Sequence, residues 1–295
     1  MEKKTIKKLP LTSDIVFKRV FAREGNEDIL TALLEAILGI SIKQVVVKNP
    51  ELPPNLYDSK AGILDIKVEI DKNVICDIEM QVQDYHDIDK RSTYYMSKLL
   101  SDNLKRSEDY KISKNTIVIN LLAFEFYKRN SYHSVAHMKF EKAKEETLVD
   151  MGYQEEEEIA TKDLEMHFIE IPKFIKKNPE AKTKIEQWLW LLAGREEKLA
   201  MAKKENKELE KAMDIIDEMS MDEKEWELYR ARQMAIMDYN TGMIKAREEG
   251  EAKGREKGER KSKIEIAKRL LKLGISIDKI KEATELTKEE IEELK

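Results

Sequence analysis

Apolar and polar residues alternate with a period of two along residues 63–83, which is the pattern of strands that bury one face. The apolar positions of the two arms are Leu64, Ile66, Val68 and Ile70, then Val74, Cys76, Ile78, Met80 and Val82. Both sets reach the same core only if Ile70 pairs with Val74 across a three-residue turn, in which Asn73 takes the left-handed conformation. The pattern therefore predicts a β-hairpin with a defined register.

This register decides which polar residues meet on the other face of the hairpin. Asp65 falls opposite Glu79, with the two Cβ atoms roughly 5 Å apart, and Gln81 follows Glu79 on the same face. A two-residue turn would instead pair Asp65 with Met80 and mix polar with apolar residues on both faces. We therefore expect Asp65, Glu79 and Gln81 to lie together.

Helical and strand patterns in the first two thirds of the chain predict an α/β domain at residues 1–195, with a mixed β-sheet flanked by helices. Ser13 or Asp14 can cap the first helix, and Gly39 ends the second. An apolar run at 116–126 is typical of a buried central strand. The predicted helices are 15–21, 26–38 and 89–105; the other predicted strands are 44–48, 116–126, 132–140 and 164–171; residues 49–57 and Glu155–Glu158 are predicted loops.

The composition of the chain changes near residue 195. All six prolines precede it, and the remainder is rich in Lys, Glu, Met and Ala, which favour helices. A helix at 182–193 is expected to dock on the first domain, followed by a charged helical region or linker at 196–263 and a small helical module at 264–295. The predicted helices are 198–216, 222–244, 264–273, 276–282 and 288–294, with Thr287 capping the last, and Gly250, Gly254 and Gly258 indicate close helix packing or a mobile linker.

Composition and charge narrow the class of protein. Charged residues make up 38 % of the chain, so part of it must be exposed, charge-rich helix. The net charge of −5 argues against a uniformly basic nucleic-acid binder. The single cysteine, Cys76, excludes an internal disulfide and a cysteine zinc site, and no apolar run approaches the roughly 18 residues of a membrane span. We expect a cytoplasmic protein with no membrane segment.

The predicted meeting of Asp65 and Glu79 has a chemical consequence. Two carboxylates so close repel each other unless a cation lies between them or one takes up a proton. Hard oxygen ligands suit Mg²⁺ or Mn²⁺, and such a metal can polarise a phosphodiester and lower the pKa of an attacking water. A solvent-exposed strand face is the common alternative, but the helix and central strand that follow at once favour a cleft.

Three segments together resemble a known family. Asp65 followed by Glu79-Met80-Gln81 resembles the Asp and Glu-x-Lys signature of the PD-(D/E)XK nuclease superfamily, with Gln in place of Lys. With the motif at residues 12–21 and the Arg91-x-x-Tyr94-Tyr95 sequence, the chain resembles the recombination-promoting nuclease/transposase (Rpn) family over roughly residues 9–180. The resemblance implies a nuclease-like fold and a Mg²⁺-dependent DNA endonuclease active in recombination, mobile-element movement or defence.

The resemblance also implies roles for single residues. Asp65 and Glu79 would hold the metal, with the Met80 carbonyl as a third ligand. Gln81 stands where the superfamily lysine orients the attacking water, but an amide carries no positive charge. Asp14 matches the N-terminal motif and either approaches the metal or caps its helix.

Basic residues near the hairpin are candidates for the charge that Gln81 lacks. Lys67 lies on the polar face of the hairpin, and Lys90 and Arg91 follow it in the chain. With Tyr94 and Tyr95 they interleave bases and aromatics that could hold the DNA backbone. The alternative is that the tyrosines pack the helix onto the sheet.

Two further functions remain open at this point. Gln81 favours a catalytically weak nuclease fold that binds DNA or a partner, and the helical tail favours a scaffold that assembles a homodimer. His133 and His137 could bind metal on a helix, but their local pattern predicts a strand, which sets them about 13 Å apart.

Overall fold

The computed structural model describes residues 7–48, 66–103, 113–140 and 159–294. Asp65, the predicted loop at 49–57 and Glu155–Glu158 lie outside these residues. Contacts divide the chain into two compact units, Met1–Arg232 and Gln233–Lys295. The first unit extends beyond the boundary expected at residue 195, because Leu199, Leu209 and Ile216 are buried in the same core as the sheet.

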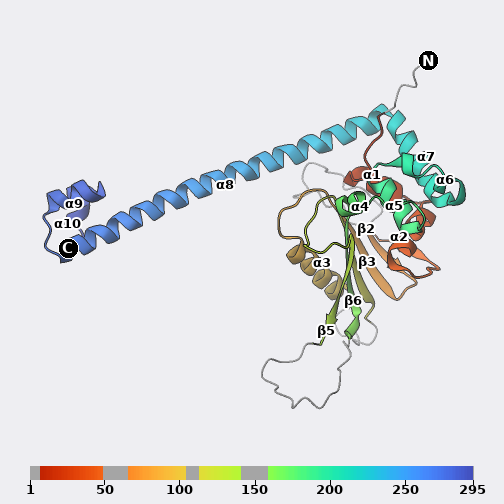
Figure 1. Ribbon diagram of the computed structural model, residues 1–295, viewed down its shortest axis with the longest axis horizontal. Coiled ribbons are helices and arrows are strands. Elements are labelled where there is room, and N and C mark those ends of the chain that lie inside the picture. Colours follow the sequence, from red (N-terminus) through yellow and green to blue (C-terminus); the bar gives the residue numbers. More distant parts are fainter. Residues whose placement is uncertain (1–6, 49–65, 104–112, 141–158, 295) are drawn as a thin grey trace, which may run out of the picture. The chain divides into compact units, whose positions relative to one another are not determined.

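Six strands form one mixed sheet in the order β1-β2-β3-β4-β6-β5 (Figure 1). The strands β3, β4 and β6 run parallel, and the other neighbours are antiparallel. Their carboxyl ends therefore meet at one edge, where Gln81, Leu122 and Glu170 lie in register. The bounds are β1 Val45–Val47, β2 Ile66–Ile70, β3 Val74–Gln81, β4 Asn115–Leu122, β5 His133–Lys139 and β6 Ile159–Glu170.

The hairpin of β2 and β3 has the predicted register over its described residues, with Ile70 opposite Val74. The prediction for Asn73 was wrong. Asp71 and Lys72 take the positive φ values, 48° and 63°, while the Asn73 N–H donates to the Ile70 carbonyl at 3.1 Å. Two positive φ values at the centre of the turn are the pattern of a type I′ turn, whose twist matches that of the strands.

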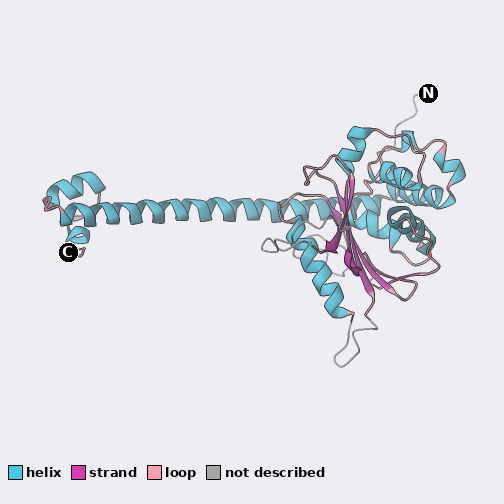
Figure 2. Cartoon of the chain, turned by 60° about the horizontal axis from the view of Figure 1, so that its bottom comes forward, coloured by secondary structure: helices cyan, strands magenta, loops and turns pink. Residues whose placement is uncertain are grey.

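Helices cover both faces of the sheet (Figure 2). The helix α3 (Ile88–Asp102) lies on one face, while α1, α2, α4, α5 and α7 surround the main hydrophobic core on the other. Met80 and Cys76 of β3 point into that core, so Cys76 is a core residue as predicted. The bounds are α1 Asp14–Phe21, α2 Glu27–Leu38, α4 Ile171–Lys177, α5 Lys184–Leu192 and α7 Lys207–Met221, and α2 ends at Gly39 as predicted.

Several predicted boundaries were wrong. The strand β4 ends at Leu122 rather than 126, because the N–H groups of Phe126 and Tyr127 bond to the Glu170 side chain of β6. The strand β6 begins earlier than residue 164, and Ile171 starts α4, with Pro172 in its first turn. The helix predicted at 198–216 is divided into a short 3₁₀ turn (Glu196–Lys198), α6 (Ala202–Glu205) and α7.

One helix, α8 (Glu223–Lys272), spans the two helices predicted at 222–244 and 264–273 and the glycine-containing stretch between them. The glycines at 250, 254 and 258 lie within it, so the chain is helical at these positions. A Cβ added to any of them would meet no described atom within 4 Å, so nothing packs closely on them. In the second unit, α9 (Ile277–Thr284) and α10 (Lys288–Glu292) pack on the end of α8, and Thr287 caps α10 as predicted.

Candidate active site

The polar face of β3 is buried beneath α3. Asp77, Glu79 and Gln81 are only 3 %, 0 % and 4 % exposed, and Met96 and Leu99 of α3 pack beside them on the same face. A solvated strand face was the alternative expected from the pattern, and it is wrong for β3. Polar side chains in such a place cost free energy unless they are hydrogen-bonded, so their partners matter.

Glu79 and Gln81 are joined directly. The Gln81 amide Nε2 donates to Glu79 Oε2 at 2.7 Å. Because successive residues on one face of a strand are two apart, this bond requires both side chains to lie on the α3 side. The structure thus brings together two of the three residues predicted to form the site; the third, Asp65, lies outside the described residues.

The sequence reasoning missed two buried residues next to Glu79. Asn120 of β4 is in register with Glu79, and Ser92 of α3 donates its hydroxyl to Asn120 Oδ1 at 2.8 Å. Asn120 Nδ2 then donates to the His167 carbonyl at 3.1 Å. These bonds fix α3 over the sheet at the level of Glu79. The signal for Asn120 was a lone amide within an apolar strand.

Lys67 lies on the α3 face of β2, where it pairs in register with Asp77. Its Nζ is 3.7 Å from the Asp102 carboxylate at the end of α3. Glu69 lies two residues after Lys67 in β2 and forms ion pairs with Lys48 and Lys114, each at 2.8 Å. The hydrogen bonds from Lys114 and Lys48 lower the pKa of Glu69 to about 2. Lys67 therefore lies on the hairpin face that carries Glu79, as predicted.

Asp14 begins α1, in the helical layer on the other face of the sheet. Its Oδ1 accepts the Ile15 N–H at 2.8 Å, and its Oδ2 accepts Arg232 Nε at 2.6 Å. The side chains of Asp14 and Arg232 are 8 % and 3 % exposed, so this is a buried ion pair. Ser13 occupies the N-cap position of α1. The prediction that Asp14 caps this helix was therefore wrong.

The predicted DNA contacts lie on α3. Lys90 is exposed and Arg91 is partly exposed, with its guanidinium 5.9 Å from the centre of the Tyr85 ring. Tyr94 is 65 % exposed and meets Tyr95 edge-on at 5.8 Å. Tyr94 therefore does not pack the helix onto the sheet.

The donor set fits a hard divalent cation. Asp77 and Glu79 place two buried carboxylates on one strand face, and Gln81 adds an amide oxygen, which are the ligand types that Mg²⁺ and Mn²⁺ prefer. The Met80 side chain points into the core, and Met80 pairs in register with Leu121 of β4. Among the described residues, no three His, Cys, Asp or Glu side chains converge as a metal site.

Comparison with known proteins identifies the family. None of the described helices combines the length and apolar character needed to cross a membrane. No curated protein and no solved structure matches the chain. A family model described as PD-(D/E)XK nuclease family transposase matches residues 11–246, most of the chain and all six strands. The chain therefore belongs to the PD-(D/E)XK nuclease family transposases.

Proposed function

We propose that this chain is a metal-dependent DNA endonuclease that hydrolyses phosphodiester bonds during recombination or mobile-element movement. The observation that carries the proposal is Glu79, a fully buried carboxylate held by Gln81 on the polar face of β3. The hairpin register, continued by one residue beyond Ile66 and Ile78, predicts Asp65 opposite Glu79. This is the pairing that the family motif requires.

Asp65, Glu79 and the Met80 carbonyl would hold the Mg²⁺ or Mn²⁺ ion. When bound, the metal would polarise the phosphodiester and lower the pKa of the attacking water. Gln81 uses its Nε2 to orient the Glu79 carboxylate, which leaves its amide oxygen to accept a hydrogen bond from that water. Lys67 supplies positive charge on the same face in place of the superfamily lysine.

The exposed side of α3 would hold the DNA backbone. Lys90 and Arg91 offer charges for phosphates, and Tyr94 offers an open ring beside them. Asp14 lies in the layer on the other face of the sheet and bonds to Arg232, so its proposed place near the metal rests on the N-terminal motif alone.

Cleavage of supercoiled plasmid with Mg²⁺ or Mn²⁺ tests the proposal. We expect nicking by the native protein and its loss in Asp65→Asn and Glu79→Gln, while calorimetric binding of Mn²⁺ weakens in both variants. Glu69→Gln is the matched control, because Glu69 is a carboxylate of the same hairpin face that is paired with lysines. Equal cleavage by all four proteins would place the chemistry elsewhere.

Gln81 supports a second candidate function, a nuclease fold that binds DNA or a partner with little or no cleavage. The Gln81 amide donates its hydrogen bond to Glu79, and it carries no charge that could stabilise the phosphate. Metal binding separates the two functions. DNA binding without Mn²⁺ binding or cleavage would favour the second.

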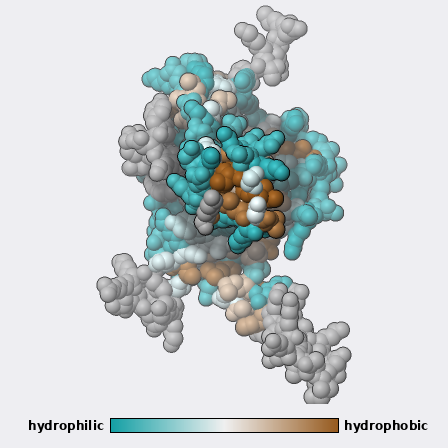
Figure 3. All heavy atoms as spheres, turned by 90° about the vertical axis from the view of Figure 1, so that its left-hand side faces the viewer, coloured by the Kyte–Doolittle hydropathy of each residue, from teal (hydrophilic) through white to brown (hydrophobic). Residues whose placement is uncertain are grey.

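The second unit supports a homodimer, which we propose as a separate property. Viewed from the end of α8, it gathers apolar side chains at its centre with hydrophilic ones around them (Figure 3). In the second unit Leu273, Ile275 and Ile266 are 74 %, 38 % and 45 % exposed, and exposed apolar patches mark association sites. Light scattering should give a dimer for the full chain and a monomer for residues 1–232. If the full chain and residues 1–232 both form dimers and neither cleaves DNA, the helical tail does not assemble the dimer, and this outcome excludes the scaffold function together with the nuclease.

A further inference from the structure

The loop of residues 123–132 joins β4 to β5 and begins beside the candidate site. The Ala123 N–H donates to the Gln81 carbonyl at 2.9 Å. The loop therefore starts at the edge where the parallel strands β3, β4 and β6 end. In open α/β sheets, ligands bind outside this edge.

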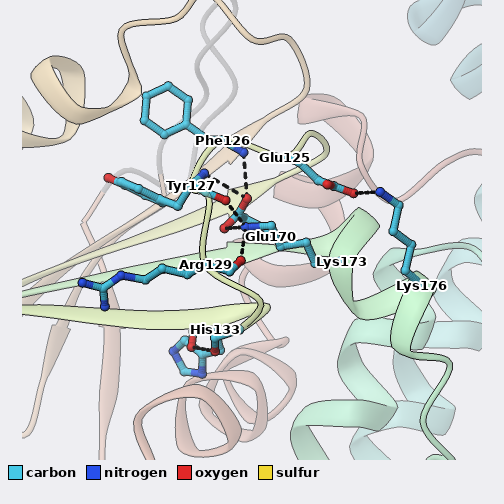
Figure 4. A network of polar contacts seen from close by, with 9 residues as sticks. Glu125, Phe126, Tyr127, Arg129, His133, Glu170, Lys173 and Lys176 are labelled. Atoms are coloured by element: carbon cyan, nitrogen blue, oxygen red, sulfur yellow. Dashed lines mark hydrogen bonds and ion pairs between the residues drawn. The ribbon is translucent and has the colours of Figure 1, made fainter.

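A buried carboxylate holds the loop in one conformation (Figure 4). Glu170, the last residue of β6, is fully buried, and its Oε2 accepts the N–H groups of Phe126 and Tyr127 at 2.7 and 3.3 Å. Its Oε1 accepts Lys173 Nζ at 2.7 Å. Lys173 also donates to the carbonyls of Tyr127 and Arg129, the latter at 2.7 Å.

This network stabilises the conformation of the loop rather than the core. Removing a carboxylate and an ammonium from water is costly, and apolar residues often serve a core equally well. Apart from their own ion pair, the Glu170 and Lys173 side chains bond to the main chain of the loop. The side chains of Phe126, Tyr127 and Arg129 point away from Glu170 (Figure 4). The network thus fixes where these side chains stand.

The loop carries two rings that are half-buried, because both pack against the cluster of Ile88, Leu122 and Phe168. Phe126 and Tyr127 meet edge-on with centroids 5.0 Å apart, and Tyr127 rests edge-on against the buried Phe168 at 5.1 Å. Burial raises the pKa of the Tyr127 hydroxyl, and the charges of Asp89 and Glu170 raise it further. The phenol therefore stays neutral at neutral pH and does not repel phosphate.

Positive charge accompanies the rings. Lys128 and Arg129 are exposed on the loop, while Glu125 is paired with Lys176 at 2.5 Å. Across the edge, Tyr85 is 44 % exposed, with the Arg91 guanidinium near its face.

Two acidic residues lie near the rings, Asp84 and Asp89. Asp84 is 2.9 Å from His86 Nδ1 and also accepts the His86 N–H. Asp89 is exposed on the first turn of α3. Rings that alternate with arginine and lysine are the composition of surfaces that bind single strands of nucleic acid.

We propose that Tyr85, Arg91, Phe126, Tyr127 and Arg129 form an aromatic platform that stacks unpaired bases of a DNA strand next to the β3 site. The inference rests on the proposed function and deepens it: the substrate is single-stranded or locally unpaired DNA rather than continuous duplex. Stacking tolerates every base, because each has a π-face, and the arginines contact the phosphates between the bases.

Binding without cleavage tests the platform. The full chain in EDTA is titrated into a single-stranded oligonucleotide that contains 2-aminopurine, whose fluorescence is quenched by stacking, and into the matching duplex. We expect tighter binding of the single strand, with quenching. Phe126→Ala and Tyr127→Ala should each weaken single-strand binding about 5- to 100-fold and reduce the quenching, with little effect on the duplex.

Two further variants guard against loss of folding. Phe126→Leu keeps apolar volume but removes the π-face, so it should lose quenching while its thermal unfolding stays native. Phe140→Ala is the matched control, because Phe140 is 68 % exposed and lies beyond the far end of β5 from the loop, so binding should not change.

The outcomes separate this inference from the nuclease proposal. If base stacking depends on Phe126 but the protein never cleaves DNA, the platform is supported and the nuclease proposal is wrong. Native binding by Phe126→Leu and Phe126→Ala, or tighter binding of the duplex, would overturn the platform even if cleavage persists.

Discussion

Glu79 is a fully buried carboxylate, and the amide of Gln81 donates to one of its oxygens. A lysine at position 81 would bring a positive charge to the same place, whereas the amide brings only a dipole. Gln81 therefore keeps the orientation of Glu79 but gives up charge stabilisation of the phosphate. The catalytic cost of this exchange can be measured at one residue.

Gln81→Lys should raise the rate of DNA cleavage on the order of tenfold, because a fixed charge at the reacting phosphate stabilises the transition state. The new ammonium would lie beside Glu79 and Asp77, so thermal unfolding should stay close to native. Gln83→Lys adds the same charge at an exposed position and should leave the rate unchanged. A lower rate in Gln81→Lys than in the native protein would mean that the amide itself has a catalytic role.

Cys76 should be unreactive in the folded protein. Its side chain is fully buried, and burial raises the pKa of the thiol well above its ordinary value, with the charges of Asp77 and Glu165 raising it further. Since the thiolate is the reactive form, a coloured disulfide reagent should label Cys76 only in urea. Rapid labelling of the native protein would show that β3 opens.

At the scale of elements, side-chain periodicity could predict the hairpin because a slip of one residue would turn every apolar side chain of β3 out of the core. It could not predict the end of β4. Residues 123–126 are apolar enough for a strand, but Phe126 bonds to Glu170, which is distant in sequence. The same limit hid Asn120 and Ser92. Two separate helices were predicted where α8 is continuous, because glycines lower helix propensity without forbidding a helix.

The pairing of β5 with β6 should weaken in mild acid. His133 Nε2 lies 2.8 Å from His167 Nδ1, and burial, with the neighbouring His167, lowers the pKa of His133 to about 4. An unfolded histidine titrates near 6.5, so between pH 6.5 and 4 the unfolded chain binds a proton that the folded chain does not. The free energy of unfolding should therefore fall as pH falls through this window.

Urea unfolding at pH 7.5, 5.5 and 4.5 measures this loss. His133→Gln cannot take up the proton, so its stability should fall less steeply than that of the native protein. Parallel slopes for the two proteins would assign the acid sensitivity to other groups.

At the scale of the whole molecule, the first unit joins the N-terminal residues to the end of α7 and the start of α8. Arg19 pairs with Glu225 at 3.3 Å, and the Leu9 N–H donates to the Ser220 hydroxyl at 3.0 Å. The buried pair of Asp14 and Arg232 completes this junction. The family match also continues past residue 195, to 246, so the start of α8 is part of the family's common region.

The Asp14–Arg232 pair lets stability and catalysis be separated. Arg232→Met leaves the Asp14 carboxylate buried without this partner, which should cost about 3–5 kcal/mol in the free energy of unfolding. Asp14→Leu combined with Arg232→Met replaces the pair by apolar side chains and should recover most of that loss. Urea unfolding and plasmid cleavage are then measured on the same proteins. If Asp14 serves only the junction, the double variant regains cleavage together with stability. A stable double variant without cleavage would instead give Asp14 a place at the metal, as the N-terminal motif implies.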